Sequence, residues 1–293
     1  MVNPVAGDGR ARRFWARGAA ACAAAGVNVN VVWTTRRGDA AEAAATANGR
    51  TVIAVGGDGT IHEVVNGLLR RPGTARPRFG ALPAGTGGDF CRSLPGPRDP
   101  ALIPGWLQAS RFKTIDVARA ATSNGRRFFI NAADAGIGAR IARRAVAAPA
   151  LLGGTARYLG AAAWSLMVHR NVAVRVRLDD GPTERLRVWT IVVANGGYAG
   201  SGMWLAPDAR LDDGWLDVVI IGDIGRPLAI RSLPLLYQGK HGRLAQVRFA
   251  RARRVEIEAE TPAQVQADGE LVGETPAVFE VIPGALDVLS WDS

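Results

Sequence analysis

Apolar and polar positions follow two different spacings along the chain, and the first third shows both. Residues 51–55 form a short apolar run that ends in glycines, which is typical of a buried strand entering a tight loop. Apolar residues then recur at helical spacing over residues 60–69, and residues 79–82 form the next short run. Together with a β-branched run at 27–33 and a helical pattern at 39–47, this order predicts a parallel sheet with helices on both sides.

The pattern changes near Ile115, after which strand-like runs outnumber helical ones. Asp179-Asp180-Gly181 separates two of the runs and predicts a hairpin turn. We therefore expect an α/β domain over residues 1–114 and a mostly β, sandwich-like domain over 115–283. The strand-like runs lie at 128–132, 173–178, 186–194, 216–221, 246–249, 254–259 and 278–282, and helical patterns remain at 138–147, 157–168 and 228–238.

A glycine-rich loop, Gly56-Gly57-Asp58-Gly59-Thr60, lies between an expected strand and an expected helix. Glycines let the backbone approach a ligand closely, and a helix N-terminus offers N–H groups to phosphate. A carboxylate such as that of Asp58 is repelled by phosphate unless a cation bridges the two, which favours Mg²⁺. The alternative is a strand–helix turn in which Asp58 or Thr60 is the N-cap.

A second loop with similar residues, from Pro83 to Phe90, follows the next expected strand. Loops at the carboxyl ends of neighbouring parallel strands border one crevice, the usual ligand position in open α/β sheets. The start Asn3-Pro4-Val5-Ala6-Gly7 would bring a third turn to the same edge. A plain surface turn is the alternative for the second loop.

Charge and composition narrow the class of partner. The 293 residues carry 36 Lys and Arg against 26 Asp and Glu, a net charge of +10, which favours nucleotide phosphate, an anionic membrane or nucleic acid. No zinc-finger or basic-repeat motif supports nucleic acid. Two cysteines, no signal peptide and no long apolar segment suggest a cytoplasmic protein that touches a membrane without crossing it.

These motifs, together with several in the second half, resemble the diacylglycerol kinase catalytic family, especially its soluble bacterial lipid kinases. The resemblance extends over nearly the whole chain. The glycine signature alone is shared with NAD kinases and phosphofructokinases, and the C-terminal motifs separate this family from both. The matching segments are Asn3 to Gly7, Gly38-Asp39-Ala40, Gly56 to Thr60, Gly85 to Phe90, Asn131 to Gly138, Asn195 to Tyr198, Pro207 to Asp217 and Asp268-Gly269-Glu270.

The resemblance implies an NAD-kinase/phosphofructokinase-like α/β domain, to which residues 284–293 return, and a C-terminal β-sandwich-like lipid-substrate domain. It implies phosphorylation of a lipid hydroxyl with ATP and Mg²⁺, with diacylglycerol as the default substrate and phosphatidic acid as the product. It further implies contact with the inner face of the cell membrane, and a homodimer.

The resemblance also assigns roles to particular residues. Glu270 accepts the proton of the lipid hydroxyl, and Asp58, Asp89 and Asp116 surround a catalytic Mg²⁺. A structural Mg²⁺ is held by the Asp213 side chain and the carbonyls of Arg210 and Trp215. The nucleotide is contacted by Asn3, Thr34, Gly56, Gly57, Asp58, Gly59, Thr60, Gly85, Thr86, Asp89 and Asp116.

The residues alone leave alternatives open at the sites in the second half. The acidic segment around Asp213 also fits a β-turn with a solvated face, and Glu270 also fits the tip of a solvated hairpin. For lipid headgroups there are two candidate clusters, Arg140/Arg143/Arg144 and Arg251/Arg253/Arg254, and each also fits a solvated charged face.

The chain departs from the family pattern in two places. Gly88 replaces a family Asn, which puts nucleotide affinity or the placement of Asp89 in question. The expected first strand has almost no room before Asn3, so it is very short or truncated. Rival functions are an NAD-kinase-like phosphotransferase acting on a soluble substrate, and a degenerate protein that binds nucleotide or lipid without turnover.

Overall fold

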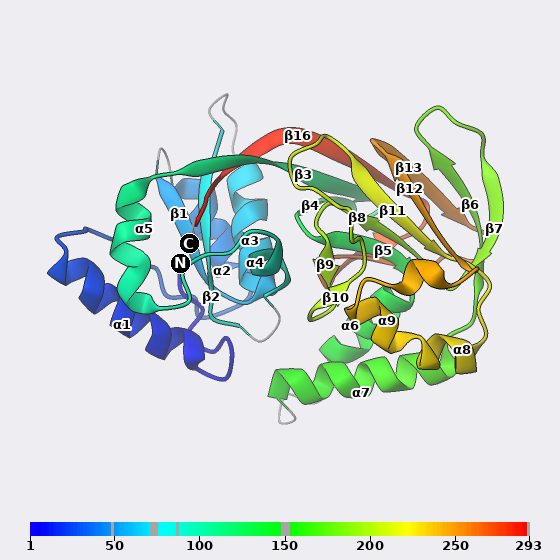
Figure 1. Ribbon diagram of the computed structural model, residues 1–293, viewed down its shortest axis with the longest axis horizontal. Coiled ribbons are helices and arrows are strands. Elements are labelled where there is room, and N and C mark those ends of the chain that lie inside the picture. The colour runs from blue at the N-terminus through cyan, green and yellow to red at the C-terminus, as the bar shows by residue number, and fades with distance from the viewer. Residues whose placement is uncertain (48–49, 71–75, 86–87, 148–152, 292–293) are drawn as a thin grey trace. The chain divides into compact units, whose positions relative to one another are not determined.

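The computed structural model describes residues 1–47, 50–70, 76–85, 88–147 and 153–291. The chain divides into two compact units, Met1–Asp116 with Pro283–Ser293, and Val117–Ile282 (Figure 1). Strands β3 (Phe112–Thr122) and β16 (Ala277–Leu289) each contribute residues to both units. The last residues of the chain therefore belong to the same unit as the first.

The first unit is built on a parallel sheet. Strand β1 (Thr51–Gly56) pairs in parallel with β2 (Arg78–Pro83), and the end of β16 pairs in parallel with the other edge of β2. On the far side of β1, Val2 forms parallel bridges to both Val55 and Trp33. At this position of the expected first strand, the described chain forms only these bridges and turns after Asn3. The run at 27–33 consequently pairs only at Trp33.

Helices cover both faces of this sheet (Figure 1). Helices α1 (Arg10–Ala24) and α5 (Ile103–Ala109) lie on one side, and α2 (Asp39–Thr46) and α3 (Asp58–Leu69) lie on the other. Two short helices, α4 (Asp89–Ser93) and η1 (Pro100–Leu102), connect β2 to α5. The core on the α1 side contains Val2, Trp15, Cys22, Val55, Leu82, Ile103 and Trp106.

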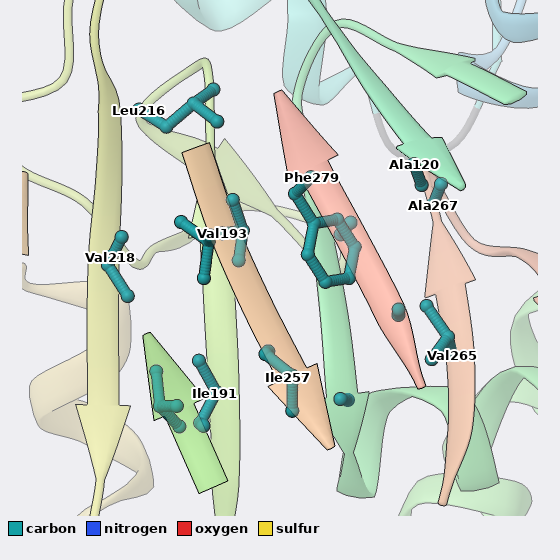
Figure 2. Packing of buried hydrophobic residues seen from close by; sticks show 14 of the residues in the cluster. Ala120, Ile191, Val193, Leu216, Val218, Ile257, Val265, Ala267 and Phe279 are labelled. Carbon is teal, nitrogen blue, oxygen red and sulfur yellow. The ribbon is translucent and has the colours of Figure 1, made fainter. Parts of the chain in front are cut away.

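The second unit contains two antiparallel sheets. One has the strand order β12–β11–β8–β5–β14–β15. The other consists of β4, β3, β16, β13, β6 and β7 and is continuous through β16 with β1 and β2, as one eight-stranded sheet. Side chains from both sheets form the core between them, among them Phe279, Val193 and Val218 (Figure 2). Phe279 packs edge-on against Phe129, with 6.4 Å between the ring centroids. The strands are β4 (Gly125–Phe129), β5 (Ala132–Gly136), β6 (Val172–Leu178), β7 (Glu184–Val188), β8 (Thr190–Ala194), β11 (Leu216–Ile221), β12 (Val247–Ala252), β13 (Arg254–Ala259), β14 (Gln264–Ala267) and β15 (Glu270–Glu274).

Helices and a small hairpin complete the second unit. The helices are α6 (Ile137–Ala147), α7 (Gly153–Val168), α8 (Arg226–Arg231), α9 (Leu233–Tyr237) and η3 (His241–Arg243). The hairpin consists of β9 (Tyr198–Ala199) and β10 (Met203–Trp204). Within the described residues, none of the helices is long and apolar enough to span a bilayer.

The predicted fold class, an α/β domain followed by a mostly β, sandwich-like one, is confirmed. Two predicted strands were wrong in their limits for one shared reason. The run at 186–194 is divided at Trp189 into β7 and β8, which lie in different sheets, and the run at 128–132 covers the end of β4 and the start of β5, which also lie in different sheets. Each of these strand-like runs spans the point where the chain leaves one sheet and enters the other.

Close packing of α2 against α3 gives a first testable prediction. A Cβ added at Gly67 would lie 2.2 Å from the Ala41 carbonyl oxygen, whereas one added at Gly59 of the same helix meets nothing within 4 Å. We expect Gly67→Ala to lower the free energy of unfolding by about 1–3 kcal/mol through overpacking. Gly59→Ala should leave it unchanged or raise it by up to about 1 kcal/mol. Urea denaturation of the two variants measures both, and equal stability would contradict this packing.

Candidate active site

The two glycine loops touch each other. Gly57 follows β1 as the N-cap of α3, and Gly85 follows the neighbouring strand β2. A Cβ on Gly85 would lie 2.3 Å from the Gly57 Cα, so no other residue fits at position 85 without moving a loop. The Ala84 N–H donates to the Gly56 carbonyl at 3.0 Å, which continues the pairing of β1 and β2 into the loops. Both loops therefore lie at one edge of the sheet, where α/β folds bind ligands.

Asp58 ties the first loop to the second. Its carboxylate accepts hydrogen bonds from the Gly88 N–H at 2.8 Å and the Phe90 N–H at 3.3 Å. These groups lie at the N-terminus of α4, where a negative side chain is favoured. The N-cap of α3 is Gly57, which has no side chain, so the alternative that made Asp58 or Thr60 the N-cap was wrong. The catalytic role of Asp58 stays a prediction.

Gly88 has a backbone conformation that also suits the Asn expected from the resemblance. Gly88 has φ +69° and a Cβ there would meet nothing within 4 Å, so the constraint is on backbone conformation and not on space. Glycine and asparagine are the two residues that best tolerate this left-handed conformation. The substitution therefore keeps the backbone that presents its N–H to Asp58.

The N-terminal turn packs against both loops. The Asn3 amide donates to the Thr60 hydroxyl at 3.2 Å, and the Thr34 hydroxyl donates to the Val2 carbonyl at 3.5 Å. Arg10 donates from Nε to the Gly7 carbonyl at 2.9 Å and from Nη2 to the Gly85 carbonyl at 3.4 Å. Sequence reasoning missed Arg10, because in a chain so rich in arginine nothing but its spacing from Gly7 distinguishes it.

Two more of the predicted nucleotide residues are buried aspartates. Asp89 is the first residue of α4, and Asp116 accepts the Gly284 N–H at 2.7 Å, which fixes the end of the chain in the first unit. Thr86 lies outside the described residues. Within the part of the chain that the structure describes, no three His, Cys, Asp or Glu side chains gather as a metal-binding group. Asp58, Asp89 and Asp116 therefore do not form one, and a catalytic Mg²⁺ stays a prediction.

In the second unit, Asp268 anchors the hairpin that carries Glu270. Its carboxylate accepts the N–H groups of Ile130 at 3.0 Å, Asn131 at 2.9 Å and Ala132 at 3.3 Å. The Gly269 N–H donates to the Gln266 side chain at 2.6 Å. Glu270 follows directly as the first residue of β15 and is half-buried. The tip of the hairpin is thus fixed by the hydrogen bonds of Asp268 and Gly269 with neighbouring segments.

A buried polar network continues from this hairpin. The Asn131 carbonyl accepts the N–H groups of Asn195 and Gly196, both at 2.8 Å. Asp134 is fully enclosed and accepts the Thr190 hydroxyl and the Gly138 N–H, each at 2.9 Å. Burial raises the pKa of Asp134 to about 6, although these hydrogen bonds favour its charged form. Sequence reasoning matched these segments to the family but gave their residues no role.

The acidic loop of the second unit includes the predicted structural metal ligands. Asp213 accepts the Trp215 N–H at 3.1 Å on one oxygen, and on the other it pairs with Arg251. Arg251 also lies 3.7 Å from Asp217, whose pKa burial raises to about 6 while Arg251 opposes the shift. The oxygens of Asp213 and of the Arg210 and Trp215 carbonyls are the kind that Mg²⁺ prefers. They fit the ion only if Arg251 moves, and this metal site stays a prediction.

Solved structures share this arrangement of a parallel α/β unit and a two-sheet β unit. A diacylglycerol kinase from Bacillus anthracis str. Sterne matches with a TM-score of 0.74 at 24% identity, over 99% of this chain and 95% of that one. An NAD kinase from Archaeoglobus fulgidus in complex with ATP matches with a TM-score of 0.52 at 17% identity, over 94% and 89%. The fold is therefore that of diacylglycerol kinases and NAD kinases.

Family models identify the two halves. Residues 1–120 match the diacylglycerol kinase catalytic domain, and residues 131–290 match the YegS C-terminal NAD kinase beta sandwich-like domain. A curated diacylglycerol kinase of Staphylococcus epidermidis is 29% identical over 282 residues, which cover 95% of this chain and 87% of the relative. The chain belongs to the diacylglycerol kinase catalytic-domain family, which confirms the resemblance seen in its motifs.

The anchoring role of Asp268 is testable by stability. Asp268→Ala leaves three backbone N–H groups without their carboxylate, which should lower the free energy of unfolding by about 2–4 kcal/mol. Asp180→Ala, at an exposed hairpin turn, is the matched control and should change it by less than about 0.5 kcal/mol. Guanidinium chloride denaturation of both variants checks this. Equal losses would contradict an anchoring role.

Proposed function

We propose that this chain transfers the γ-phosphoryl group of ATP to the hydroxyl of diacylglycerol, giving phosphatidic acid. Membership of the family makes it a lipid kinase and supports ATP as the phosphoryl donor that we propose. One observation carries the assignment of the donor site. Two glycine loops that touch each other follow the neighbouring parallel strands β1 and β2, and the loop after β1 leads directly into helix α3. Diacylglycerol is proposed as acceptor because relatives matched over most of the chain are named for it.

In this proposal the phosphates are held mainly by backbone. The N-terminus of α3 presents N–H groups and the positive end of a helix dipole beside the two loops. Thr60 and Asn3, already hydrogen-bonded to each other, would contact the nucleotide from one side. Arg10 keeps the loops together and brings a positive charge to the same edge. The Mg²⁺ role implied for Asp58, Asp89 and Asp116 is kept as part of the proposal, although in the described residues these side chains do not gather as a metal-binding group. The ion when bound would neutralise phosphate charge.

Glu270 is proposed as the general base. A lipid hydroxyl is a weak nucleophile, and a carboxylate within hydrogen-bond reach can accept its proton as the phosphoryl group transfers. The carboxylate must be positioned for this, and the anchored turn at Asp268 and Gly269 fixes the backbone immediately before Glu270. The hairpin thus supports a positioned base better than a solvated tip would.

We further propose that helices α6 to α9 contact an anionic membrane surface, at the inner face of the cell membrane. Residues 137–170 and 224–245 contain nine Lys and Arg and no Asp or Glu. Apolar side chains are exposed on the same helices, with Met167 at 63%, Tyr237 at 55% and Ile230 at 45%. Arg144 lies over the ring of Trp164 at 3.7 Å, the mixture of basic and aromatic groups that suits a lipid interface.

The second arginine cluster is less suited to that role. Arg251 pairs with Asp213, and Arg254 pairs with Glu256 and Glu280. Their charges are therefore largely matched within the protein. A homodimer, which the family resemblance implies, is retained as part of the proposal without a surface assigned to it.

Loss of the proposed base should stop turnover and spare nucleotide binding. We expect Glu270→Gln to lower the rate of phosphoryl transfer to diacylglycerol by about 10²–10⁴-fold. Its affinity for ATP should stay within about threefold of the wild type, because uncharged Gln keeps the size of the side chain. ATP consumption in mixed micelles and a nucleotide-binding titration measure the two quantities. Glu274→Gln, on the exposed end of the same strand, is the control and should keep full activity.

Measuring transfer to several acceptors distinguishes a lipid kinase from an NAD-kinase-like enzyme and from a protein that binds without turnover. Diacylglycerol, a sphingoid base, ceramide and phosphatidylglycerol are tested beside NAD as a soluble acceptor. Transfer to NAD alone would reject the lipid-kinase proposal in favour of an NAD-kinase-like enzyme. ATP binding without transfer to any acceptor would favour a protein that binds without turnover.

Charge reversal on α6 tests the membrane surface. Arg140 and Arg143 are both exposed, and we expect Arg140→Glu/Arg143→Glu to weaken binding to phosphatidylglycerol vesicles about tenfold or more. The wild-type binding should itself weaken as salt rises. Arg126→Glu/Arg185→Glu changes net charge equally at exposed positions of β4 and β7, and vesicle co-sedimentation should show little loss. Equal loss in both double variants would place the contact elsewhere.

A further inference from the structure

The loop between β10 and β11 concentrates negative charge. Four carboxylates, those of Asp208, Asp212, Asp213 and Asp217, fall within ten consecutive positions. The side chains of Asp213 and Asp217 are only 17% and 9% exposed, so water screens them poorly. Arg210 pairs with Asp212 at 3.3 Å and leaves the two buried carboxylates to another cation.

Arg251 supplies that cation from the neighbouring strand. In the antiparallel pairing of β11 with β12, Arg251 is the direct partner of Asp217, so the register of the sheet places it there. Its Nη2 donates to Asp213 Oδ2, and its Nε lies 3.7 Å from Asp217 Oδ1. The guanidinium also lies 5.7 Å from the centre of the Trp215 ring. One side chain thus contacts both buried carboxylates and the aromatic ring beside them.

We propose that Arg251 is the built-in cation of this loop and that it competes with Mg²⁺ for Asp213. A divalent ion approaching Asp213 Oδ2 meets a positive guanidinium already bound to that oxygen, and like charges at such separations repel strongly. Guanidinium is always charged and donates in a planar fork that suits carboxylates. In this chain the loop is therefore held closed without bound metal, and removing Arg251 converts it into a Mg²⁺-dependent loop.

Arg253 provides a matched comparison in the turn that directly follows β12. It lies two positions from Arg251 and also stacks on Trp215, at 4.7 Å from the ring centre. Within the described residues, however, its guanidinium pairs with no carboxylate. Both arginines therefore contact the Trp215 ring, but of the two only Arg251 also pairs with carboxylates of the acidic loop.

The test is thermal unfolding without nucleotide, with either a chelator or millimolar Mg²⁺. Arg251→Gln should lower the melting temperature in chelator by roughly 2–6 °C, and Mg²⁺ should recover most of that loss. Wild type and Arg253→Gln should respond to Mg²⁺ by less than about 1 °C. Arg251→Gln/Asp213→Asn should lose the Mg²⁺ response, which assigns it to this loop. Arg251→Lys keeps the charge with fewer donors and should fall between wild type and Arg251→Gln.

The proposal is overturned if wild type gains as much from Mg²⁺ as Arg251→Gln does and loses that gain in Asp213→Asn. It is equally overturned if Arg251→Gln or Arg251→Lys is destabilised with no response to Mg²⁺, or if Arg251→Gln is as stable as wild type. No lipid or ATP turnover enters the measurement, so its outcome is independent of the lipid-kinase proposal.

Discussion

The contact between Gly57 and Gly85 is the constraint on which the first unit depends. Two parallel strands end side by side, and the loops after them meet at a distance that leaves no space for a Cβ at position 85. Because the backbones themselves touch, no side chain separates the two loops where Gly57 meets Gly85. Asn3, Arg10 and Asp58 all add hydrogen bonds that hold this same meeting point. The proposed phosphate site is thus a consequence of strand pairing and loop contact before any charged group is considered.

Aspartates in this chain serve repeatedly to join distant pieces of backbone. Asp58 receives N–H groups from the second glycine loop, Asp116 from Gly284, and Asp268 from residues 130–132. Ionised carboxylates accept several strong hydrogen bonds, so each can join backbone segments that are far apart in sequence. This use does not exclude a role in metal binding or catalysis, since each oxygen has more than one lone pair. It does mean that replacing such a residue changes the backbone as well as the charge, and that activity loss alone would not define its role.

The sequence was a good guide to the parallel strands and to most strands of the second unit, although it did not predict helix α1 or strand β3. It failed at 128–132 and 186–194, where the chain crosses between sheets while remaining buried, because hydrophobicity does not mark which sheet a residue joins. Strands β14 and β15 were missed because they are short and carry glutamines and glutamates. For the site, glycine spacing located both loops, but Arg10 and the anchoring role of Asp268 depend on contacts between residues far apart in sequence.

Two groups of arginines can be distinguished in this chain, those paired with carboxylates of the protein and those on helices without acidic residues. On β12 and β13, Arg251 and Arg254 face carboxylates across the sheet, so their charge is matched inside the protein. On α6 to α9 the sequence places no acidic residue at all, and exposed apolar side chains lie among the cations. Arginines that are paired as in the first group stabilise the fold, and their charge is not left for an external anion. Nine Lys and Arg lie in the second group, and within the described residues no ion pair joins them to a carboxylate. This uncompensated charge is the reason for proposing that α6 to α9 face an anionic membrane.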